Sequence, residues 1–246
     1  MSEQTCGNLK KNIDFYGWFF VVLIICVGLL PQLIPWGMFI DGITYATISR
    51  NLSIGIGSSC LPCYTDTLWS PFYEQPPLAF ILQSIFFRIG GDHYLTEKVY
   101  SLFTMLITLF LIHKTWKCLF TGIKKEQFAH LSWLPVLLWL IMPKCIWAYK
   151  SNVLENTMCF FCLLSFYLWL KAMFSKQPML VVVTSFLMAL SLVAAVLTKG
   201  IPGLFPVVSP FIIAITISCV PKIKSCFCLH NMFCYFRISN LGNYVV

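Results

Sequence analysis

Long uninterrupted runs of apolar residues divide this sequence, and they restrict its fold more than any other feature. Of the 246 residues, 59% are hydrophobic and only 11% are charged, whereas soluble domains are nearer half apolar and about a quarter charged. A helix of about 20 apolar residues crosses the ~30 Å hydrocarbon core of a bilayer. The sequence therefore predicts an all-α polytopic membrane protein. The apolar runs cover residues 17–38, 76–90, 98–117, 129–147, 156–173, 178–197 and 202–220.

Six of these runs are long enough to span a membrane, and the run 76–90 is not. As a helix, its roughly 15 residues reach only about 22 Å. Ser84 and Arg88 lie four residues apart and so share one helix face, which is typical of a helix that lies in the membrane interface. We expect six transmembrane helices, and two interfacial helices over 41–53 and 77–90.

The distribution of Lys and Arg supports this arrangement. With a cytoplasmic N-terminus and no crossing by 76–90, the loops on the cytoplasmic side collect most of the positive charge, as the positive-inside rule requires. If 76–90 crossed, every later loop would change sides and the bias would reverse. The predicted cytoplasmic loops are 118–128 and 171–177, and the predicted outer segments are 39–97, 144–156 and 198–201.

The net charge of +8 follows from these loop lysines, so we expect membrane lipids as partners and no nucleic acid. Lys10 and Lys11 precede an apolar run that no small-residue cleavage site follows, and we interpret that run as a retained signal anchor. We treat residues 1–221 as one transmembrane domain. The tail, 222–246, is rich in Cys and lacks helical periodicity.

Two of the twelve cysteines, Cys60 and Cys63, have CxxC spacing in the first outer loop. Outside the cytoplasm such a pair can form a disulfide. A zinc site needs four ligands, and no matching pair stands nearby in the sequence. The pair is therefore either incidental, a disulfide or, least favoured, a metal site.

Acidic residues gather in the predicted outer segments, although acids are rare in this chain. Asp41 directly follows the first span, where Asp is also a favoured helix N-cap. Glu74 stands two residues before Pro76, in "FYEQPPLAF", and Glu155 opens a later apolar run. Glu74 alone could be a solvated loop acid or a helix-dipole partner. Three acids on one side of the membrane fit that interpretation less well.

The order of motifs around these acids resembles a known enzyme family. The sequence reads "DGITYATISRNL", then "FYEQPPLAF", then "GGDHYLTEKVYSL", then "LENTM". This series is similar to the polytopic GT-C glycosyltransferases of the protein-mannosyltransferase and aminoarabinose-transferase superfamily, and most similar to bacterial members of glycosyltransferase family 39. The resemblance covers roughly residues 15–215.

The resemblance implies a membrane enzyme that moves a sugar from a polyprenyl-phosphate donor to an acceptor hydroxyl of a lipid, glycan or protein. It places such an enzyme in the bacterial cytoplasmic membrane, with the active face outside. Asp41 corresponds to the catalytic carboxylate of the family, Glu74 to a second catalytic-site acid, and Glu155 to an acid that is commonly Asp. The Lys-Gly pair at an outer helix end matches Lys199. Tyr45 belongs to the first motif and is implied to contact substrate.

The chain departs from the family pattern in two places and in length. Gln75 stands where the family often has Lys, and Lys98 where many members have Arg. Members usually have about twice as many spans, so the resemblance implies a C-terminally truncated chain.

The chemistry of such a transfer needs a carboxylate base for the acceptor hydroxyl and cations for the leaving phosphate. We expect Asp41 as the base, with Arg50, Lys98 and Lys199 near the phosphate. A divalent cation is possible between the outer acids, although no sequence motif fixes one.

Two other interpretations stay open. The chain could be an inactive fragment of such an enzyme. It could also be a transporter, although transporters place ionisable residues inside their spans, and the apolar runs here contain almost none.

Overall fold

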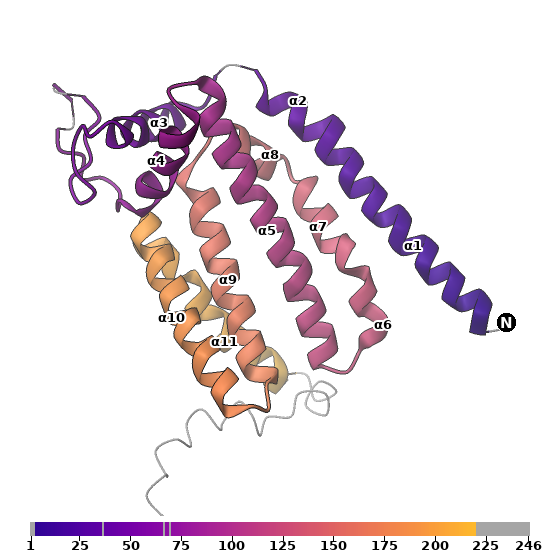
Figure 1. Ribbon diagram of the computed structural model, residues 1–246. Helices are drawn as coiled ribbons and strands as arrows, with labels where there is room; N and C mark the ends of the chain where they lie inside the picture. Colours follow the sequence, from indigo (N-terminus) through magenta and orange to yellow (C-terminus); the bar gives the residue numbers. More distant parts are fainter. Residues whose placement is uncertain (1–2, 36, 66, 69, 220–246) are drawn as a thin grey trace, which may run out of the picture.

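A computed structural model describes residues 3–35, 37–65, 67–68 and 70–219 (Figure 1). Within these ranges the regular structure is helical, apart from one isolated bridge between Gly57 and Pro62. The expected all-α architecture is therefore confirmed. The first helix, α1 (Glu3–Leu23), continues through a π-helical stretch, η1 (Ile24–Leu29), into α2 (Leu30–Leu33).

Three long helices stand side by side at the centre of the molecule (Figure 1). They are α5 (Tyr94–Gly122), α9 (Leu154–Phe174) and α10 (Pro178–Lys199), and α9 packs on both of the others. Because only residues 175–177 connect α9 to α10, the two helices run antiparallel as a hairpin. Gln177 precedes α10, and Pro178 opens it at a position where the missing amide hydrogen has no helical partner to lose.

Four helices of the described chain are long and apolar enough to cross a membrane, or five if one bent pair counts as a single span. The four lie over Asn12–Leu33, Tyr94–Gly122, Leu154–Phe174 and Pro178–Lys199. They correspond to four of the six expected spans. The chain is thus an integral membrane protein by the length and composition of its helices.

The expected span over 129–147 is a bent pair of helical segments rather than one straight helix. Glu126–Leu140 and Pro143–Lys150 meet at an angle of 69°. Pro143 explains the bend, because proline has no amide hydrogen to donate and disfavours a helical conformation at the residue before it. The segments are α6 (Glu126–Ala129), η2 (His130–Ser132), α7 (Trp133–Leu140) and α8 (Pro143–Lys150).

The last expected span, 202–220, begins as a short 3₁₀ turn, η3 (Ile201–Leu204), and continues as α11 (Phe205–Cys219). The apolar helix found there, Ile201–Ile212, is shorter than a span. The expected count of six spans is therefore not confirmed. The tail, 222–246, lies outside the described residues.

Both short helices predicted for the first outer loop are present. They are α3 (Ile40–Ser53) and α4 (Leu78–Gly90), and their bounds lie within one residue of the expected 41–53 and 77–90. They pack on one another beside the upper ends of α5 and α10 (Figure 1). Each is about 20 Å long or less, too short to cross a bilayer, so both close one end of the bundle.

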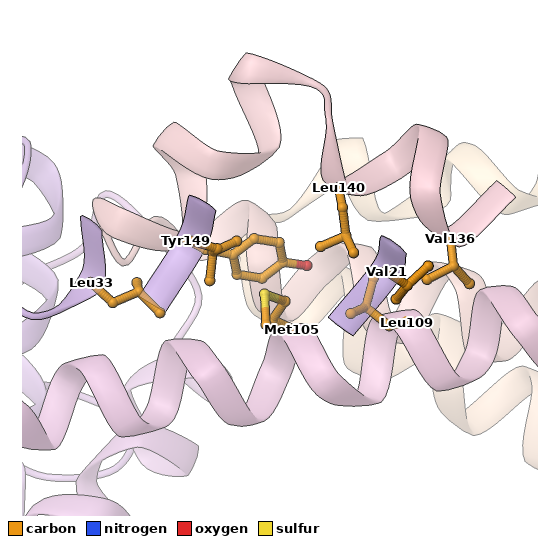
Figure 2. Packing of buried hydrophobic residues seen from close by; sticks show 8 residues of the cluster. Val21, Leu33, Met105, Leu109, Val136, Leu140 and Tyr149 are labelled. Atoms are coloured by element: carbon orange, nitrogen blue, oxygen red, sulfur yellow. The ribbon is translucent and has the colours of Figure 1, made fainter. Parts of the chain in front are cut away.

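An apolar cluster joins the outer helices α1, α7 and α8 to α5 (Figure 2). At its centre Met105 and Leu109 of α5 meet Leu140 of α7 and the ring of Tyr149 of α8. Met105 is fully buried. The bent pair therefore packs on α5, and α1 packs mainly on α7 of that pair. The cluster comprises Val21, Leu29, Leu33, Met105, Leu109, Val136, Leu140 and Tyr149.

Candidate functional site

A second apolar cluster, at the end of the bundle closed by α3 and α4, brings together segments far apart in the sequence. The ring of Phe80 on α4 lies 5.8 Å from the ring of Tyr45 on α3 and 5.7 Å from the ring of Phe72 in the preceding loop. Leu154, the first residue of α9, belongs to the same cluster. Glu74 is two residues from Phe72, and Glu155 follows Leu154, so this packing also collects the acids.

A close backbone contact positions Asp41. A Cβ atom added to the next residue, Gly42, would lie 1.8 Å from the carbonyl oxygen of Ser151. Only glycine lets α3 approach the turn before α9 so closely. The Asp-Gly pair therefore places a carboxylate in the first turn of α3, next to the segment that leads to Glu155.

Asp41 is not the N-cap of this helix. Phe39 occupies the N-cap position of α3 and makes no side-chain capping bond. Asp41 is the acidic residue of the first turn, where a carboxylate interacts favourably with the helix dipole. The capping interpretation of Asp41 is therefore wrong, while a modest dipole contribution is retained.

The three predicted acids all lie near enough to Tyr45 to act on it electrostatically. Its side chain is buried, and burial is the main reason that its pKa rises to about 12, with the negative charges of Asp41, Glu155 and Glu74 adding to the effect. Tyr45 lies one helical turn after Asp41, on the same face of α3. The phenol thus stays protonated at neutral pH and offers one hydroxyl donor within a group of carboxylates.

Glu155 forms an ion pair with Lys199, which joins the start of α9 to the end of α10. Each residue also sits where its charge suits the helix dipole, an acid in a first turn and a base in a last turn. The Glu155 side chain is 49% exposed and that of Lys199 24% exposed. The pair is therefore accessible to a ligand in the solvent.

Lys98 is placed differently from the other predicted bases. It is buried, and its ammonium donates to the carbonyl oxygen of Gly37 at 3.3 Å and to that of Lys150 at 2.9 Å. Gly37 precedes α3, and Lys150 precedes the Ser151 carbonyl that touches Gly42. Lys98 therefore ties together the two segments that position Asp41.

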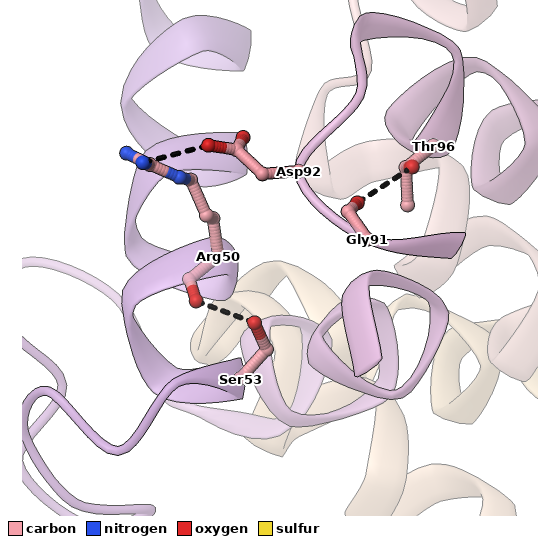
Figure 3. A network of polar contacts seen from close by, with 5 residues as sticks. All are labelled: Arg50, Ser53, Gly91, Asp92 and Thr96. Atoms are coloured by element: carbon pink, nitrogen blue, oxygen red, sulfur yellow. Dashed lines mark hydrogen bonds and ion pairs between the residues drawn. The ribbon is translucent and has the colours of Figure 1, made fainter. Parts of the chain in front are cut away.

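Arg50 lies away from Asp41, at the other end of α3. It follows Asp41 by nine residues, which is about 13 Å along a helix, and its Nη2 atom pairs with the Oδ2 atom of Asp92 at 2.7 Å (Figure 3). The carbonyl of Arg50 accepts from Ser53, while Thr96 donates to the carbonyl of Gly91 in the same turn. The Arg50–Asp92 pair links α3 to the connection between α4 and α5.

Several asparagines hold the site together, and the sequence reasoning missed them. Asn51 donates to the carbonyls of Cys63 and Tyr64 and so fixes the loop that carries Glu74. Asn152 adopts a φ of 49°, a left-handed conformation that Asn tolerates better than most residues, and accepts from Ser101. The sequence "KSNVLEN" contains a turn signal that could have indicated this arrangement.

The described residues contain no group of three His, Cys, Asp or Glu side chains close enough to hold a metal ion. Cys60 is an exposed free thiol and Cys63 a buried one. Among the described residues, Asp41, Glu74 and Glu155 therefore do not lie close enough together to bind one metal ion. Comparison of the chain with protein-family models, with curated proteins and with solved structures found no match.

Proposed function

We propose that this chain is a membrane glycosyltransferase that moves a sugar from a polyprenyl-phosphate donor to an acceptor hydroxyl at the extracytoplasmic face. The observation that carries the proposal is the apolar cluster around Tyr45. It brings together α3, which bears Asp41, with Phe72 and Leu154, next to which Glu74 and Glu155 stand in the sequence. These acids come from three separate segments, and the motif resemblance assigns a role to each of them.

The geometry suggests a division of roles in this reaction. Asp41 is the general base that takes the proton of the acceptor hydroxyl. The protonated Tyr45 donates a hydrogen bond that orients a carboxylate of the group, and Glu74 positions the acceptor. Lys199 leaves Glu155 to meet the donor phosphate, because a charge-assisted bond to phosphate can replace the exposed ion pair.

Two predicted phosphate ligands take other roles in this proposal. Lys98 already donates to two carbonyl groups and is a positioning residue for Asp41. Arg50 is held by Asp92, so it stabilises the platform formed by α3 and α4. The donor phosphate therefore depends chiefly on Lys199.

The test is a transfer assay with the protein in lipid nanodiscs. Undecaprenyl phosphate carrying radiolabelled mannose, glucose or aminoarabinose is offered as donor, and extracted bacterial envelope material as acceptor. Because general-base catalysis contributes about 10²–10⁴-fold, we expect Asp41→Asn to lower transfer by that factor and leave donor binding nearly unchanged. Glu126→Gln, an acid at the other end of the bundle, is the matched control and should keep full transfer.

Absence of transfer by the unaltered chain with every donor would contradict the proposal. Near-normal transfer by Asp41→Asn would instead keep the enzyme and remove Asp41 as its base. A chain that binds the donor without transferring sugar is the outcome expected of an inactive fragment.

A further inference from the structure

The apolar cluster of Figure 2 ends in a layer formed by Val21, Leu109 and Val136. One turn further on, away from α3, each of the three helices presents different residues. On α1 these are Gly17 and Trp18, on α5 His113, and next to Val136 Ser132 and Trp133. A polar layer therefore succeeds the apolar one.

Direct contacts show that this layer is packed together. The ring of Trp18 lies 5.2 Å from the ring of His113. A Cβ atom on Gly17 would lie 2.2 Å from the indole of Trp133, so α1 and α7 touch at this glycine. Asp14 precedes Gly17 by three residues and Trp18 by four, which places it on the same face of α1.

Four polar atoms of this layer are buried without a hydrogen-bond partner in the described chain. They are Oδ1 of Asp14, Nδ1 of His113, Oγ of Ser132 and Nε1 of Trp133. Ser132 is only 1% exposed. Buried polar atoms are nearly always hydrogen-bonded, if necessary to internal water. Here an obligate acceptor, an obligate donor and two groups that can do either lie on three packed helices.

Charge adds to this pattern. Burial and the charges of Lys117 and Lys114 on the same helix disfavour a protonated His113, and only the charge of Asp14 acts in the opposite sense. The neighbouring segments contribute His130 in η2 and Glu126 in α6, while α7 carries no titratable residue. An acid of α1 and an imidazole of α5 are thus close enough to interact electrostatically, with two lysines nearby.

We propose that Asp14, His113, Ser132 and Trp133 enclose a hydrated polar site at the end of the bundle opposite α3. Water bridges the carboxylate to the imidazole, and Asp14 is the group of the site whose charge favours a protonated His113. His113 lies 19 residues beyond Tyr94 at the start of α5, or about 28 Å along the helix. The site is therefore separate from the acids around Tyr45, and it lies where α1 packs on α7.

Nitrogen-15 NMR of the histidine rings in lipid nanodiscs tests the proposal. His113→Asn identifies the His113 signals by their loss. We expect magnetisation transfer from water to the His113 ring. In Asp14→Asn the titration midpoint of His113 should move to lower pH, because a nearby carboxylate favours the charged imidazole. Glu126→Gln should leave the midpoint unchanged.

A His113 ring without water contact, or a midpoint equal in Asp14→Asn and the unaltered chain, would overturn the site. If Asp14→Asn does not fold, the water contact of the His113 ring in the unaltered chain decides the proposal by itself. These outcomes do not depend on sugar transfer, so they stand apart from the proposed enzyme activity.

Discussion

Tyr45 shows how one buried side chain can hold several separate charges in relation to each other. Its ring belongs to the apolar cluster with Phe72, Phe80 and Leu154. The negative charges of Asp41, Glu155 and Glu74 raise the pKa of its hydroxyl in addition to the effect of burial. A phenylalanine would fill the same space. The ring therefore accounts for the packing, and the hydroxyl alone accounts for the interaction with the acids.

This arrangement predicts an alkaline loss of stability. The folded-state pKa of about 12 exceeds the ordinary value of 10.0 for a tyrosine. Unfolding therefore releases a proton between these values, and the stabilisation present below pH 10 is lost as pH rises toward 12. Tyr45→Phe should show a smaller fall in melting temperature between pH 9 and pH 11 than the unaltered chain. Tyr73→Phe, at an exposed tyrosine, should behave like the unaltered chain, and an equal fall in Tyr45→Phe would contradict the assignment.

Glu155 allows stability and function to be separated. Exposed ion pairs contribute about 0–1 kcal/mol, so Glu155→Gln should change the free energy of unfolding by less than about 1 kcal/mol. If Glu155 orients the reacting groups, the same variant should lose roughly 10- to 100-fold in transfer. Chemical denaturation and the donor assay together measure both. Unchanged transfer would confine Glu155 to its ion pair.

At the scale of elements, the position of α3 depends on the close contact between Gly42 and the carbonyl of Ser151. The α-hydrogen of Gly42 faces this carbonyl where a methyl group has no room. Overpacking of this kind costs about 1–3 kcal/mol, and here it would also displace Asp41.

We therefore expect Gly42→Ala to lower the midpoint of thermal unfolding and to abolish most transfer. Gly28→Ala is the matched control, because an added Cβ there meets only Ile24, at 3.8 Å, and Ala is the better helix former. Circular dichroism melts measure both variants. Equal melting temperatures would show that α3 does not need its close approach to the turn before α9.

The short helix α4 was predictable because local signals mark both of its ends. Pro77 precedes α4 and Gly91, with a φ of 69°, follows it. Pro143 itself signals a helix break. The sequence nevertheless predicted one span there, because the apolar run continues through the proline. The partners of Lys98 could not be predicted, since its carbonyl acceptors are 61 and 52 residues away and carry no side-chain pattern. The same is true of His113, whose acidic neighbour comes from another helix.

At the scale of the whole molecule, the positions of the loops define one testable topology. With the N-terminus inside, Cys60 lies outside and the connection between α5 and α6 lies in the cytoplasm. Cys60 is exposed, so an impermeant maleimide added to intact cells should label it in a background without other cysteines. A cysteine at Lys125 should react only after the membrane is opened. Labelling of position 125 from outside would reverse the map.

The site around Tyr45 also has a consequence for the order in which the chain is made. Glu155 leaves the ribosome 114 residues after Asp41 (155 − 41), while the α9–α10 hairpin closes over a loop of three residues. Local pairs form early and distant ones late, because loop closure costs entropy. Asp41 and Glu74 are therefore synthesised before α9, the helix that brings Glu155 to them. The complete acid cluster is consequently a late product of biogenesis, and every earlier intermediate is without it.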